Sequence, residues 1–326
     1  MFKLPLSDFD RAALRKHCAQ VGKSPIGSDE YLIAVWEGKT DKPLDMSTLR
    51  VEVIEEARKI AAEIAAAEAA KVRPVRIEVN VGGTVTVLPD SHRHEVFERV
   101  LRALSVRENV YLVGPAGSGK TTIAAQAAEA LGLPFYSTGA VGMAFQLQGF
   151  INAEGKYQET DLYRAYVGGG VFLFDEIDAS SAQALLAFNA ISANDQAAFP
   201  CGTVKRHPDF VIIAAANTYG SGATAEYVGR SQLDAATLDR FVFLPMDYDE
   251  RLELLIGGND EWTRHVQAFR RKVREHKVRH VVSPRASIKG AKLLAAGIDW
   301  VDVEEMVLFR GLTATDREKL VIKRAA

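Results

Sequence analysis

Glycines, a lysine and a threonine are spaced along GPAGSGKTT, residues 114–122, in the pattern G-x-x-x-x-G-K followed by Ser or Thr. Glycines at these positions allow backbone N–H groups to converge on phosphate oxygens, and a helix that starts here adds the positive end of its dipole. In this pattern the lysine reaches the β- and γ-phosphates and the hydroxyl coordinates Mg²⁺. The segment, called the P-loop below, therefore predicts a site for ATP and Mg²⁺, with Lys120 and Thr121 in these two roles. The residues expected to contact the nucleotide are Gly114, Pro115, Ala116, Gly117, Ser118, Gly119, Lys120, Thr121 and Thr122.

Two carboxylates, Asp175 and Glu176, follow the apolar run in GGGVFLFDEID, residues 168–178. A buried strand that ends here presents them at the carboxyl edge of a sheet, where open α/β proteins bind ligands. We expect Asp175 to be the second metal ligand beside Thr121, and Glu176 to orient or deprotonate the attacking water. A carboxylate directly after the metal-linked one favours hydrolysis over transfer to a second substrate. Taken without the P-loop, the pair could equally be a solvated strand end.

A third apolar run, DFVIIAAANTYG at residues 209–220, ends in the amide side chain of Asn217. An amide at the same sheet edge can donate to the γ-phosphate or accept from the attacking water without adding charge. We therefore predict Asn217 as a catalytic residue, with a turn-forming asparagine as the alternative.

The apolar runs alternate with helical patterns from about residue 94 to residue 245, which predicts a parallel sheet between helices. Before them, residues 76–89 alternate as a β-hairpin with a Gly-Gly turn, and residues 48–74 have strong helix propensity. The chain thus divides into an N-terminal region with a helical arm and this hairpin, an α/β nucleotide-binding core and a helical lid. Their expected ranges are 1–88, 89–246 and 247–326.

The bulk composition argues against several classes of protein. A formal net charge of −2 over 326 residues gives no general reason for binding nucleic acid or an acidic membrane. The two cysteines cannot form a disulfide framework, and no stretch of about 18 apolar residues is present. We expect a soluble cytoplasmic protein.

Five motifs follow one another in the order found in AAA+ ATPases. They are the P-loop, VFLFDEID at 171–178, Asn217, LDAATLDRF at 233–241 and SPRA at 283–286. The ordered set resembles the AAA+ family and implies its fold, a P-loop core with a parallel sheet between helices and a helical lid after it.

The resemblance extends over about residues 90–310 and is closest to the MoxR-like and dynein-related group, in particular the small ATPase subunit of cobaltochelatase. Residues 146–170 are similar to the insert that faces the central pore in that group, and residues 194–210 to its hairpin before Asn217. MoxR proteins usually continue with an asparagine–arginine pair where this sequence has Asp178 and Ala179, which favours the cobaltochelatase-type branch.

The resemblance also implies roles for three arginines. Arg240 matches the arginine finger that completes the nucleotide site of a neighbouring subunit, and an ion pair with Asp239 or Asp234 is the alternative. An exposed ion pair contributes about 0–1 kcal/mol, whereas a finger lowers the barrier by roughly 4–7 kcal/mol. Arg230 is a second candidate for action on a neighbour, and Arg285 matches the lid arginine that contacts the γ-phosphate. Sites shared between subunits imply a closed ring, and we expect a homo-hexamer.

The expected function is an ATP-driven motor that remodels a partner protein, by family analogy one with a von Willebrand factor A domain. The alternative is action on DNA or a nucleoprotein complex through the basic residues of EWTRHVQAFRRKVREHKVRH, residues 261–280. A small-molecule kinase is disfavoured by Glu176, Asn217 and Arg285 together. In the basic segment we predict an apolar stripe of Trp262, Val266, Phe269 and Val273 opposite Arg264, Arg270, Arg271, Lys272, Arg274, Lys277 and Arg279.

Overall fold

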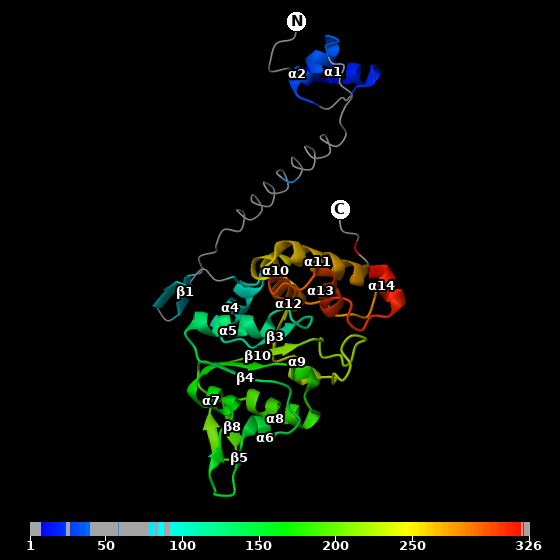
Figure 1. The fold of residues 1–326 in the computed structure, drawn as a ribbon. Helices are drawn as coiled ribbons and strands as arrows, with labels where there is room; N and C mark the ends of the chain where they lie inside the picture. The colour runs from blue at the N-terminus through cyan, green and yellow to red at the C-terminus, as the bar shows by residue number, and fades with distance from the viewer. Residues whose placement is uncertain are drawn as a thin grey trace. The chain divides into compact units, whose positions relative to one another are not determined.

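The computed structural model describes residues 8–23, 27–39, 58, 78–81, 84–87, 92–320 and 322 (Figure 1). The chain divides into two compact units, residues 1–75 and 76–326. The helix expected over residues 48–74 lies outside the described residues, except for position 58.

The first unit contains two helices, α1 (Asp8–Gln20) and α2 (Asp29–Trp36). A small apolar core joins them, and a two-pronged ion pair from Arg11 to Asp29, with N···O distances of 2.7 and 2.8 Å, ties the two helices together. The core residues are Leu14, Cys18, Leu32 and Val35.

The second unit begins with the predicted hairpin. Strands β1 (Glu78–Val81) and β2 (Thr84–Val87) pair antiparallel, with Glu78 opposite Val87 and Val81 opposite Thr84. The prediction of a hairpin is confirmed.

A five-stranded sheet forms the centre of the second unit, and its strands run in the order β11-β3-β10-β7-β4. All its neighbouring pairs are parallel, as predicted. The strands are β3 (Val110–Val113), β4 (Phe135–Thr138), β7 (Gly170–Phe174), β10 (Phe210–Ala216) and β11 (Val242–Pro245). The P-loop strand β3 therefore lies between β10, which leads to Asn217, and β11, which leads to the lid.

Helices cover both faces of this sheet (Figure 1). On one face lie α4 (Phe97–Ser105) and α5 (Lys120–Leu131), and on the other α7 (Asp161–Gly168) and α8 (Ala182–Ser192). Alternate residues of β10 enter the two cores, because successive side chains of a strand point to opposite faces. The central strands β3, β7 and β10 are buried along their whole length, which explains their continuous apolar sequences.

Short elements extend from the core. The segment 146–170 contains the end of α6 (Phe145–Gln148) and a small hairpin of β5 (Phe150–Ile151) and β6 (Tyr157–Gln158). A second hairpin, β8 (Gln196–Phe199) with β9 (Gly202–Lys205), precedes β10. The 3-10 helix η1 (Ile177–Ala179) follows β7, and α9 (Ala235–Leu238) precedes β11.

The C-terminal part is helical, as predicted, and consists of α10 (Glu250–Ile256), α11 (Asp260–Glu275), α12 (Pro284–Ala295), α13 (Trp300–Val307) and α14 (Ala314–Leu320). The predicted apolar stripe of α11 is buried in its core. The prediction for Arg270 is wrong, because only 3% of this residue is exposed. Its guanidinium pairs with the buried carboxylate of Glu253 on α10 instead of facing solvent.

Among the helices of the described residues, none has the length and apolar character needed to span a bilayer.

Candidate active site

The P-loop leaves β3 at Val113 and enters α5 at Lys120 through backbone that favours glycine. Gly117 and Gly119 have φ angles of 80° and 98°, in the left-handed region. A Cβ at Gly114 would overlap the carbonyl of Met246, and one at Gly117 would lie 2.8 Å from the side chain of Ser283. The loop therefore packs closely against both the end of β11 and the start of the lid helix α12.

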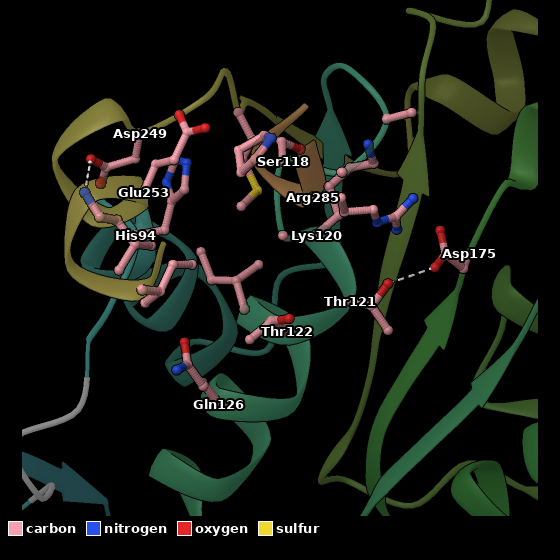
Figure 2. Close-up of a pocket in the computed structure, with 18 of the residues that line it drawn as sticks. His94, Ser118, Lys120, Thr121, Thr122, Gln126, Asp175, Asp249, Glu253 and Arg285 are labelled. Atoms are coloured by element: carbon pink, nitrogen blue, oxygen red, sulfur yellow. Dashed lines mark hydrogen bonds between the residues drawn. The ribbon is translucent and has the colours of Figure 1, made fainter. Parts of the chain in front are cut away.

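A cavity of about 390 Å³ opens beside the P-loop, between the core and the lid (Figure 2). Its volume lies within the range of about 300–1,000 Å³ typical of ligand sites. Of the predicted site residues, those that line it are Ala116, Gly117, Ser118, Gly119, Lys120, Thr121, Thr122, Asp175, Glu176, Asn217 and Arg285. Gly114 and Pro115 contribute backbone carbonyls behind this surface.

Lys120 is held inside the site. Its Nζ donates to the carbonyls of Gly114 and Pro115 at 2.8 and 3.0 Å and to Oδ1 of Asn217 at 3.1 Å. Burial lowers the pKa of Lys120 to about 8, and the nearby carboxylate of Asp175 opposes this shift. The three oxygens to which this ammonium group donates are uncharged, and a phosphate would add an anion beside it.

The predicted metal ligands meet directly. Thr121 Oγ1 donates to Oδ2 of Asp175 at 2.8 Å (Figure 2). A hydroxyl and a carboxylate oxygen are ligands of the kind that Mg²⁺ prefers. The buried Oγ of Ser118, in the same wall, has no hydrogen-bond partner among the described residues. The hydroxyl groups of Ser118 and Thr121 and the carboxylate of Asp175 are therefore suited to binding a phosphate with its magnesium ion.

Glu176 occupies an unusual backbone conformation, with φ 52° and ψ 39° in the left-handed region. Its N–H donates to Oδ1 of Asp175 at 2.9 Å, and its side chain is 53% exposed. Glu176 lines the cavity together with Thr121 and Asp175. Oε1 of Glu176 lies 3.6 Å from Nη2 of Arg230.

Asp178 is a site residue that sequence reasoning noted only as a departure from the MoxR pattern. It is completely buried, and Oδ2 accepts from Thr218 Oγ1 at 2.9 Å and from the N–H groups of Thr218 and Asn217 at 3.2 and 3.3 Å. Oδ1 accepts from Arg230 Nη1 at 3.1 Å. Asp178 thus fixes the end of β10, from which Asn217 reaches Lys120.

The lid contributes the opposite wall. Pro284 occupies the first turn of α12, as predicted, and Arg285 next to it extends toward the end of the cavity where Thr121 and Asp175 lie (Figure 2). Tyr248, in the connection from β11 to the lid, donates its hydroxyl to the carbonyl of Ala116 at 2.9 Å.

A buried ionic network connects this tyrosine to the lid and was not predicted. The guanidinium of Arg270 lies 4.5 Å above the ring of Tyr248 and donates to both carboxylate oxygens of Glu253, at 2.7 and 2.8 Å. Ser287 of α12 donates to the same carboxylate at 2.6 Å. Glu253 also lines the cavity, so the network links α10, α11 and α12 to the P-loop.

His94 lies on the side of the cavity away from Thr121 and Asp175 (Figure 2). His94 Nδ1 accepts from the N–H of Val96 at 3.3 Å, so Nε2 carries the proton and donates to the carbonyl of Asp247 at 2.9 Å. The apolar residues Met246, Leu252, Ile256 and Ile288 also line the cavity, and the side chain of Met246 lies near Gly119 of the P-loop.

Two predicted arginines do not line the cavity. Arg240 follows α9, and its Nε is buried without a hydrogen-bond partner in the described part of the chain. Arg230 does not line the cavity, but its guanidinium contacts the carboxylates of Asp178 and Glu176 of its own chain.

A comparison with protein families finds a match over the part of the chain that contains this site. Residues 109–241 match the family model of the AAA domain, dynein-related subfamily. Among solved structures, the RuvB Holliday junction branch migration motor of Thermotoga maritima has 17% identity and a TM-score of 0.43, with 69% of this chain and 74% of that chain covered. NtrX from Brucella abortus in complex with ATP has 14% identity and a TM-score of 0.47, with 94% and 77% covered. A comparison with curated proteins gives no match.

The matched segment begins at β3 and ends after Arg240, so it contains the P-loop, both carboxylates and Asn217. This match confirms the resemblance to AAA+ proteins. It does not distinguish the MoxR and cobaltochelatase branch from other members of the dynein-related subfamily. Residues 109–241 of this chain are therefore similar to the AAA domains of the dynein-related subfamily.

Proposed function

We propose that this chain binds ATP with Mg²⁺ and hydrolyses it to ADP and phosphate. The observation that carries the proposal is the 2.8 Å contact between Thr121 and Asp175, with Lys120 and Glu176 on the wall of the same cavity. Thr121 and Asp175 would hold the magnesium ion, which when bound neutralises charge on the β- and γ-phosphate oxygens. Lys120 would bind the phosphates, and Glu176 would orient the attacking water and take up its proton.

The remaining predicted residues have roles around the γ-phosphate. Asn217, held by Lys120 through its carbonyl oxygen, keeps its NH₂ group for a phosphate or water oxygen. Arg285 would add a cation from the lid and couple the nucleotide to the lid angle.

We further propose that the active form is a homo-hexamer, in which Arg240 of one subunit completes the nucleotide site of the next. Two observations support this role: the buried Nε of Arg240 has no hydrogen-bond partner among the described residues, and Arg240 lies outside the cavity of its own chain. The ring would use the hydrolysis cycle to remodel a partner protein, as MoxR and cobaltochelatase ATPases do. The proposal that this partner contains a von Willebrand factor A domain follows from that resemblance alone.

The alternative, action on DNA, receives less support from the basic helix. Arg270 is buried, and Arg271 and Arg274 pair with Glu250 and Asp247 at 3.3 and 3.1 Å. These ion pairs reduce the positive charge available for phosphate contacts.

The test compares wild-type protein with Glu176→Gln and Lys120→Ala, in assays of phosphate release and of nucleotide binding. We expect Glu176→Gln to bind ATP and lose hydrolysis, and Lys120→Ala to lose both. Equal phosphate release by wild type and Glu176→Gln would contradict the proposed function. Affinity isolation with Glu176→Gln and ATP, against Lys120→Ala as control, should then recover the ring with its protein partner. Stimulation of hydrolysis by DNA with steep salt dependence would favour the alternative.

A further inference from the structure

The segment after β10, residues 220–232, returns to the site of its own chain. Its two ends meet through a bridge between Ser221 and Gln232 and a hydrogen bond of 2.9 Å from Leu233 N to Gly220 O. Within the segment, the hydroxyl of Tyr227 accepts from the N–H of Ala116 in the P-loop at 2.9 Å. The segment is therefore closed at its base and fastened to the P-loop near its tip.

Arg230 is anchored in this segment by a buried carboxylate. Its side chain is only 12% exposed, and Nη1 lies 3.1 Å from Oδ1 of Asp178. The N–H of the next residue, Ser231, donates to the backbone carbonyl of Asp178 at 2.7 Å, which fixes the position of the arginine from a second side. The other oxygen of Asp178 is already engaged by the end of β10.

This arrangement holds Arg230 at the site of its own chain and prevents it from reaching the nucleotide of a neighbouring subunit. If the guanidinium left to reach another subunit, the carboxylate of Asp178 would remain buried without its cation, which is strongly unfavourable. Among the described residues, Nε of Arg240 has no hydrogen-bond partner, so Arg240 lacks a comparable anchor there.

The second terminal nitrogen of Arg230 faces Glu176. Nη2 lies 3.6 Å from Oε1, which is an ion contact rather than a hydrogen bond. Asp178, Arg230 and Glu176 therefore form a chain from a buried anchor through a nearly buried cation to an exposed carboxylate. The guanidinium of Arg230 restricts the positions that the carboxylate of Glu176 can take.

We propose that Arg230 is a positioning residue for Glu176 of the same subunit, with Asp178 as its anchor, and not a finger for the neighbouring site. The inference rests on the proposed function, because it assigns Glu176 the task of activating water. Displacing a reacting group by about 1 Å can cost about 10²-fold in rate. Arg230→Ala should accordingly lower kcat by about 10- to 100-fold and leave nucleotide affinity within about twofold of wild type, since Arg230 does not line the cavity.

Two further variants separate positioning from folding. Arg230→Lys keeps a cation for Asp178 and should recover part of kcat at unchanged affinity. Val228→Ala changes an exposed side chain of the same segment and should leave activity at the wild-type level. Wild-type kcat in Arg230→Ala, or a parallel loss of affinity and kcat in Arg230→Ala and Arg230→Lys, would overturn the proposal.

Mixing experiments decide whether Arg230 acts within one chain. Arg230→Ala and Lys120→Ala chains are mixed, and the ATPase rate is compared with the sum of the separate rates. If Arg230 served a neighbour, an interface with an intact P-loop on one side and an intact Arg230 on the other would restore activity. We expect no gain. A gain clearly above the sum would overturn the inference.

The mixture of Arg240→Ala with Lys120→Ala is the matched comparison and should gain activity if sites are shared. If neither mixture gains, no site is shared between chains, and the loss in Arg230→Ala is then a loss within one chain, as proposed. That result would count against the ring but not against Arg230. Failure of the proposed function is seen separately, as hydrolysis that persists in Glu176→Gln.

Discussion

The hydroxyl of Thr121 donates to Oδ2 of Asp175 at 2.8 Å and thereby joins the first turn of α5 to the end of β7. The two oxygen ligands of the expected metal are held together by this bond. The first prediction is that Asp175→Asn raises the Mg²⁺ concentration needed for half-maximal hydrolysis by about 10- to 100-fold, a range seen when groups around a bound metal are changed. Thr121→Ser retains the hydroxyl and should stay close to wild type. Equal Mg²⁺ titration curves for Asp175→Asn and wild type would contradict the metal assignment.

The second prediction concerns pH and Lys120. Burial lowers its pKa to about 8 in the free site, and phosphates next to the ammonium group must raise it again in the complex. Above about pH 8 the complex therefore carries more protons than the free protein, and ATP affinity should fall as pH rises, by up to about tenfold per pH unit. Calorimetry at pH 9 in two buffers of different ionisation enthalpy should show proton uptake. A pH-independent affinity between 7.5 and 9.5 would exclude titration of Lys120 in this range.

The third prediction concerns the buried pair of Glu253 and Arg270. Arg270→Met leaves the carboxylate of Glu253 without its cation and should cost about 3–5 kcal/mol of unfolding free energy. The control on the same helix is Arg274→Met, whose partner Asp247 is exposed, and the expected cost is about 0–1 kcal/mol. Urea unfolding followed by tryptophan fluorescence reports on the lid, which contains Trp262 and Trp300. Similar midpoints for the two variants would show that the network is not a source of stability.

The fourth prediction concerns Gly290 of α12. A Cβ there would overlap the indole ring of Trp262, which is fully buried and donates from Nε1 to the carbonyl of Ala286 at 3.1 Å. Gly290→Ala should destabilise the lid by about 1–3 kcal/mol, although alanine usually favours a helix by about 0.5–1 kcal/mol. Gly168→Ala, at the end of α7, meets nothing within 4 Å and should be neutral or stabilising. A higher melting temperature for Gly290→Ala would show that Trp262 can move aside.

The residues that sequence patterns predicted well are those whose signals are local. The P-loop, the carboxylates after β7 and the start of α12 at Pro284 each depend on a few adjacent residues. The apolar stripe of α11 follows from helical periodicity alone.

The residues that were missed depend on partners far along the chain. Arg270 was predicted to be exposed because its buried partner, Glu253, is 17 residues away on another helix. Asp178 gave no local sign of its role, because it binds Thr218 and Arg230, which are 40 and 52 residues away. Arg230 was a second candidate for action on a neighbour, and the sequence does not show that its own chain supplies a carboxylate for it. Folding alone brings these charges together.

Glu176 occupies a left-handed backbone conformation that side chains other than glycine and asparagine rarely adopt, at a cost of roughly 1–2 kcal/mol. This strain lies at the residue that, in the proposed function, orients the attacking water. Glu176→Asn should therefore melt at a higher temperature than wild type while hydrolysing poorly, whereas Glu176→Gln should lose activity without gaining heat resistance. The backbone conformation of this one residue would then lower thermal stability while it serves catalytic activity. A single substitution at this position would give a protein that is inactive but melts at a higher temperature.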